Sequence, residues 1–188
     1  MDNRAPIIKP GTYQDILDAP EHMVAELAHG VLHLQRRPPA LAALAQTRLM
    51  FVIFSHFCGR KAEFGGWWIL REPEVHLGEN VLVPNAAGWK RERMPELPDA
   101  SYTDLAPDWA CEVLSPDARQ FDLVEKRALY GEAGVGDLWF VDPKARTLEA
   151  FANTDGVWTL VTALKDDDMV SVRPFDAIEF DLSALWPD

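Results

Sequence analysis

The spacing of apolar and polar residues predicts a short helix, a β-hairpin and a long helix in the first third of the chain. Thr12 and Asp15 form a capping pattern, which favours a helix from Tyr13 to about Asp18. The stretch Met23–Leu34 alternates around Gly30, as expected of two paired strands and their turn. From about Leu41 to Phe57, apolar residues recur at helical spacing, which indicates a helix packed on a sheet.

Short apolar runs then predict several strands, at residues 67–70, 74–77, 81–83 and 88–89. The proline-rich stretch 94–107 is expected to be a surface loop. It leads into Trp109–Leu114, which is continuously apolar except for Glu112. Runs of this kind are typical of a central strand that is covered on both faces.

The last third of the chain predicts a helix between two buried strands, and then a hairpin. The helix should run from about Arg119 to Ala133, capped by Asp117, and Leu138–Val141 should be the second strand. A strand–helix–strand unit implies a parallel, right-handed crossover. Residues 147–152 and 157–164 should pair around a turn at 155–156, and residues 175–186 suggest an edge strand and a turn. The expected fold is therefore α/β, a mixed sheet flanked by helices with additional hairpins.

Composition places the chain among single-domain globular proteins, with the domain covering residues 1–188. Hydrophobic residues make up 48% and charged residues 26%. Cys58 and Cys111 are expected to be reduced core thiols, which favours a cytoplasmic location. No apolar run of membrane-spanning length and no signal-peptide pattern is recognised, so no membrane partner is expected.

The net charge of −12 argues against general nucleic-acid binding, because such binders gain most of their affinity from basic surfaces. The nearest candidates for phosphate contacts are Arg36, Arg37 and the basic run at Lys90, Arg91 and Arg93. Either group could equally be a solvated face.

Glu112 is the most informative single residue, because an ionised carboxylate in an apolar strand needs a partner or a metal ion. Lys126 lies on the following helix, four residues after Asp122, and could approach Glu112 if that helix packs back over the sheet. The pair could serve chemistry or could be a buried ion pair with a purely structural role.

Two more polar residues have two interpretations each. Asn85 follows the strand at residues 81–83, where polar residues often line a functional crevice, but Asn is also a common turn former. Glu26 lies in the first hairpin and could belong to a site or to the solvent face of its strand.

Several motifs together resemble a known family. They are Glu26–Gly30, Val83–Trp89, Pro107–Pro116, Asp122, Glu125–Lys126, Tyr130, Ala133–Val135, Leu138–Trp139 and Val141–Pro143. This combination, within a resemblance from about Thr12 to Trp186, is similar to the Uma-type restriction endonucleases of the PD-(D/E)XK superfamily. The resemblance implies a restriction-endonuclease-like fold and a homodimer.

The resemblance also implies roles for individual residues. Glu112 would bind Mg²⁺ or Mn²⁺ together with the carbonyl of Val113, and Lys126 would stabilise charge in the reaction, with Glu26 supporting the site. Asn85 stands where the family usually has a metal-binding Asp, so this metal ligand carries no charge. The expected function is thus a Mg²⁺-dependent endonuclease acting on DNA, in which Asn85 indicates either a degenerate site or an altered substrate. The alternative is a catalytically inactive nuclease-fold module that binds a partner.

Overall fold

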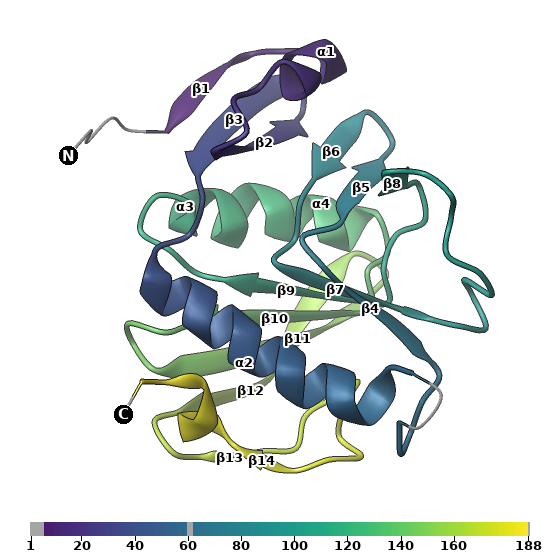
Figure 1. Ribbon diagram of the computed structural model, residues 1–188, viewed down its shortest axis with the longest axis vertical. Helices are drawn as coiled ribbons and strands as arrows, with labels where there is room; N and C mark the ends of the chain where they lie inside the picture. Colours follow the sequence, from purple (N-terminus) through teal and green to yellow (C-terminus); the bar gives the residue numbers. More distant parts are fainter. Residues whose placement is uncertain (1–5, 60–61, 188) are drawn as a thin grey trace.

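The computed structural model describes residues 6–59 and 62–187 and has helices on both faces of a mixed sheet (Figure 1). Within these residues the main sheet has six strands in the order β12-β11-β10-β9-β7-β4. Their bounds are Trp67–Arg71 (β4), Ala86–Lys90 (β7), Trp109–Val113 (β9), Asp137–Asp142 (β10), Thr147–Thr154 (β11) and Val157–Lys165 (β12). β9 and β10 run parallel, and the other neighbours in this sheet are antiparallel. The predicted α/β fold and its parallel crossover are confirmed.

The alternation of β9 divides the core into two layers. Trp109, Cys111 and Val113 pack in one cluster with the inner face of α2 (Ala40–Phe57). Ala110 and Leu114 belong to the other cluster, on the side of the crossover helix. Because successive strand residues point to opposite faces, Glu112 must point toward the crossover helix.

That crossover helix is one predicted element but three in the structure: α3 (Arg119–Phe121), a π-helical turn η1 (Asp122–Lys126) and α4 (Arg127–Glu132). Its predicted cap is wrong, since Ala118 precedes α3 and no side chain caps it. A π-helical turn is rare, and such turns are frequent at functional sites.

A second sheet contains the predicted N-terminal hairpin and lies above the crossover helix in Figure 1. Its strand order is β1-β3-β2-β6-β5-β8. The bounds are Ile7–Pro10 (β1), Met23–Ala28 (β2), Val31–Arg36 (β3), Glu74–Leu77 (β5), Asn80–Leu82 (β6) and Tyr102–Thr103 (β8). The short predicted helix is α1 (Tyr13–Leu17), and its capping box is present.

The C-terminal segment packs beside α2 and forms a small sheet of its own. β13 (Met169–Val170) pairs with β14 (Phe180–Asp181), and the 3-10 turn η2 (Leu182–Leu185) follows and contacts α2. The structure thus replaces the predicted edge strand with a two-stranded sheet.

Among the described residues, α2 is long and apolar enough to cross a membrane by length and composition, with a mean hydropathy of 1.4. The expectation that no segment would pass this test needs correcting. The buried residues of α2 nevertheless pack on the main sheet, so the helix belongs to the core of this fold. A single helix of this kind is weak evidence for a membrane.

Candidate active site

Three residues that are far apart in the sequence meet in one buried cluster. The Lys126 ammonium lies 2.8 Å from Glu112 Oε1 and 2.9 Å from Glu26 Oε1. All three side chains are at most 2% exposed. Glu26 therefore does not lie on a solvent face, and the predicted approach of Lys126 to Glu112 is observed.

Asp122 is a fourth member of the cluster, and its role was not foreseen. Its Oδ1 lies 3.6 Å from Lys126 Nζ, one turn earlier on the same helix. Lys126 also donates a hydrogen bond to the carbonyl of Val83 at 3.1 Å. The ammonium is thus held by three carboxylates and one backbone carbonyl from β2, β9, η1 and the β6–β7 turn.

The cluster contains more acidic groups than basic ones, which shows in its pKa values. Burial raises the pKa of Glu112, against the effect of nearby Lys126, and burial raises the pKa of Asp122 well above its usual range. Burial alone would lower the pKa of Lys126, but its carboxylate neighbours, Glu112 foremost, outweigh burial and raise it. Lys126 is therefore a permanent cation, and the carboxylates compete for its charge.

Tyr130 lies one turn after Lys126 on the crossover helix and contacts the same oxygen of Glu112. Its hydroxyl donates a hydrogen bond of 2.6 Å to Glu112 Oε1. Burial raises the pKa of Tyr130 well above its usual range, with the charge of Glu112 adding to the effect. Tyr130 is therefore a neutral hydrogen-bond donor that fixes the orientation of the carboxylate.

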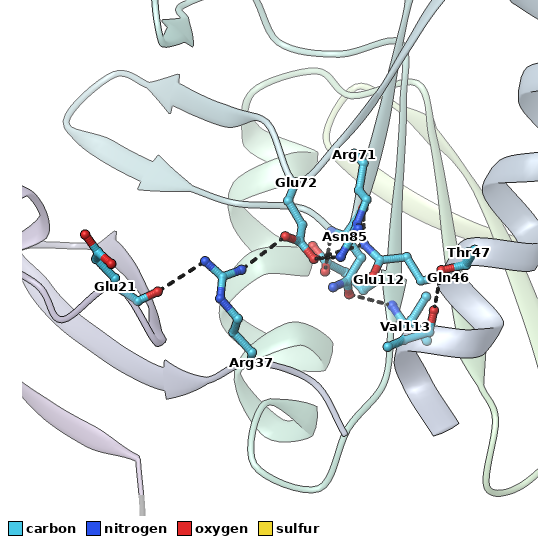
Figure 2. Close-up of polar contacts among 10 residues, drawn as sticks. Glu21, Arg37, Gln46, Thr47, Arg71, Glu72, Asn85, Glu112 and Val113 are labelled. Carbon is cyan, nitrogen blue, oxygen red and sulfur yellow. Dashed lines mark hydrogen bonds and ion pairs between the residues drawn. The ribbon is translucent and has the colours of Figure 1, made fainter. Parts of the chain in front are cut away.

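Asn85 connects the β6–β7 turn to β9 through its backbone and its side chain (Figure 2). Its N–H donates a long hydrogen bond of 3.4 Å to Glu112 Oε2, and its Oδ1 accepts one of 2.8 Å from the N–H of Val113. The amide oxygen therefore already has one donor, and Glu112 Oε2 is the less engaged of the two carboxylate oxygens.

A second polar network holds the Asn85 turn from outside (Figure 2). Gln46 of α2 donates to the Asn85 carbonyl at 2.6 Å and to Glu72 at 3.3 Å. Glu72 also accepts from Arg37 at 3.5 Å and from Arg71 at 3.2 Å. Both guanidinium groups are 57% exposed, so they form a basic rim beside an acidic interior.

A small open pocket of about 40 Å³ lies over the cluster. Its lining includes Glu26, Gln35, Asn85, Glu112, Asp122 and Lys126. The available donors are carboxylate, amide and carbonyl oxygens, the type that Mg²⁺ and Mn²⁺ prefer. In the described part of the chain, no three Asp, Glu, His or Cys side chains are arranged to hold a metal ion. Any cation here would depend on Glu112, Asn85 and the backbone at Val113.

The residues predicted from sequence thus converge, and three participants were missed. Asp122 and Tyr130 were among the residues of the resemblance, and their helical spacing of four from Lys126 could have identified both. Gln35 had no such signal, because a single Gln in an alternating strand suggests a solvent face.

Comparisons with known proteins agree with this picture of the fold. The family model Uma2, described as "Putative restriction endonuclease", matches residues 11–184. A crystal structure from Anabaena variabilis, described as "a putative nuclease belonging to DUF820", has a TM-score of 0.76 and 21% identity. The match covers 94% of this chain and 97% of that one, and at this identity the likeness concerns the fold. No curated protein matches the chain. Because the family model spans nearly the whole sequence, the chain belongs to the Uma2 family.

Proposed function

We propose that this protein is a divalent-cation-dependent endonuclease that hydrolyses phosphodiester bonds in DNA. The observation that carries the proposal is the convergence of Glu112, Lys126 and Glu26 beneath one open pocket. Membership in the Uma2 family supports the reaction class. The exposed guanidinium groups of Arg37 and Arg71 offer a local basic rim, which a chain of net charge −12 needs in order to approach DNA.

In this proposal, Glu112, the side chain of Asn85 and the backbone of Val113 would hold the cation. A bound Mg²⁺ or Mn²⁺ would supply Lewis-acid chemistry and lower the pKa of a bound water. Lys126 would stabilise negative charge that develops on the phosphate, since its raised pKa keeps it protonated and unsuited to act as a base.

Glu26 would act as a positioning residue. Its Oε1 accepts a hydrogen bond of 2.8 Å from the N–H of Val83 and contacts Lys126 at 2.9 Å. Those two contacts tie the β6–β7 turn, which carries Asn85, to the ammonium.

A second candidate function is a binding module with no catalysis. Two observations favour it. Asn85 Oδ1 already accepts a hydrogen bond from the N–H of Val113, and three carboxylates already surround the Lys126 ammonium. An uncharged Asn85 also weakens cation binding by on the order of a kcal/mol or more relative to an Asp.

The plasmid test separates the two candidates. With Mn²⁺ or Mg²⁺, we expect the wild-type chain to nick supercoiled plasmid slowly and Asn85→Asp to do so about tenfold faster or more, because a second charged ligand strengthens cation binding. Glu112→Ala is the inactive control. If both the parent and Asn85→Asp leave the plasmid intact across metals and pH, the endonuclease proposal fails.

The homodimer and the cytoplasmic location remain proposals. For the dimer, β12 offers a surface: it is the edge strand of the main sheet, and Val157, Leu160 and Val161 are 66%, 51% and 45% exposed. An edge strand of this length, whose one charged residue is Lys165 at its end, can pair with a second copy about a two-fold axis.

We therefore expect a dimer in light scattering at micromolar concentration, converted to a monomer by Val161→Lys. The same change at the exposed Val124, on the crossover helix, should leave the dimer intact. A wild-type monomer at these concentrations would contradict the prediction.

A further inference from the structure

Gln35 has a buried acceptor atom with no partner, next to the candidate site. It lies near the end of β3, is 5% exposed and lines the same pocket as Glu112 and Asn85. Its Oε1 is buried and accepts no hydrogen bond within the described part of the chain. Buried polar atoms without partners are rare, so each one calls for an explanation.

The orientation of this amide is fixed by its neighbour. Gln35 Nε2 donates to Glu26 Oε2 at 3.3 Å. The reverse orientation would place two acceptor oxygens against each other, since an ionised carboxylate has no proton to donate. Gln35 therefore keeps its oxygen away from Glu26 and without a donor.

The charges around Gln35 indicate what kind of group would satisfy it. Glu26, Glu112 and Asp122 all line the pocket, and Lys126, which contacts all three carboxylates, and Arg36 are the basic residues of its lining. An anion would meet three carboxylates and an unpaired acceptor, which is unfavourable. A small cation with affinity for oxygen would meet negative charge and, in the amide oxygen of Gln35, one more oxygen ligand. Gln46 also has an unpartnered Oε1, but it does not line this pocket.

We propose that Gln35 is a cation-site residue, whose amide oxygen serves as a further neutral oxygen donor toward the divalent cation. This inference rests on the proposed function. It also bears on Asn85, because a second amide oxygen would partly offset the missing carboxylate. The site would then rely on one charged ligand, Glu112, and neutral oxygens, which implies weaker binding than a site with two carboxylates.

Calorimetric titration with Mn²⁺ in the absence of DNA tests the inference. We expect Gln35→Leu to weaken Mn²⁺ binding about three- to tenfold, the scale of one lost polar interaction. Gln35→Glu should instead bind Mn²⁺ more tightly than the wild type, and added Mn²⁺ should raise its Tm by more than it raises that of the wild type. The exposed Gln120→Leu is the matched control and should bind like the wild type.

The outcomes separate this inference from the function on which it rests. In one outcome, the wild type binds Mn²⁺, Glu112→Ala abolishes binding, and both Gln35 variants bind Mn²⁺ as tightly as the wild type. This outcome overturns the role of Gln35 but leaves the proposed function standing. If neither the wild type nor Asn85→Asp binds Mn²⁺, the proposed function is overturned and the role of Gln35 with it. Opposite shifts for Gln35→Leu and Gln35→Glu support the inference, since a purely structural glutamine would not produce them.

Discussion

Replacing Lys126 with Met should destabilise the fold by about 3–5 kcal/mol at neutral pH, the largest stability effect expected of any polar change in this protein. The substitution keeps the length of the side chain but removes the ammonium that contacts three buried carboxylates. Urea unfolding of both proteins, followed by tryptophan fluorescence, measures the difference. The exposed Lys144→Met is the control and should change stability by less than about 0.5 kcal/mol.

The loss should depend on pH with a defined sign. The folded-state pKa values of Glu112 and Asp122 are raised, so their contribution to stability is greatest at low pH and is lost as pH rises through those pKa values. Without the ammonium, both pKa values should rise further. The destabilisation by Lys126→Met should therefore be larger at pH 8 than at pH 5. An equal loss of stability at pH 5 and pH 8 would show that the ammonium does not hold these carboxylates in their charged form.

Glu112→Gln should have the largest effect on cation binding and little effect on folding. Removing outer partners of metal ligands usually costs 10- to 100-fold in affinity, so loss of the single charged ligand should weaken Mn²⁺ binding by about 100-fold or more. The amide keeps the shape of the carboxylate, and an acceptor remains for Tyr130. Glu26 and Asp122 still accompany Lys126, so stability should change by only about 1 kcal/mol.

Calorimetry with Mn²⁺ and urea unfolding of the same samples measure both parts of this prediction. The exposed Glu149→Gln on β11 removes an equal charge far from the pocket and serves as the control. Equal Mn²⁺ affinity for Glu112→Gln and Glu149→Gln would mean that the cation, if bound, is bound elsewhere.

Local patterns were enough to predict most of the fold. The apolar run Trp109–Val113 predicted a central strand, and its one charged residue, Glu112, singled that strand out as the place of a candidate site. The strand–helix–strand order implied the parallel pairing of β9 with β10. The Asp155–Gly156 turn likewise predicted the β11–β12 hairpin. These features depend on neighbours in sequence, which is why a sequence pattern can carry them.

Features that depend on distant contacts could not be predicted. Burial of Glu26 requires the second sheet to cover the crossover helix, and no alternation within β2 reveals that. The backbone φ of Glu72 is +47°, which is unusual for a non-glycine residue. Its carboxylate accepts hydrogen bonds from Arg37, Gln46 and Arg71, which lie on three separate segments. The π-helical turn at Asp122–Lys126 also has no local signature, because its spacing is enforced by packing.

We propose that a divalent cation occupies the pocket between Glu112 and Asn85, and a crystal soaked in Mn²⁺ is the direct test. We expect anomalous density about 2.0–2.4 Å from Glu112 Oε2 and from an amide oxygen, with Lys126 still beside Glu26. Crystals soaked at a high Mn²⁺ concentration that show no density there, with the Lys126 contacts unchanged, would contradict it.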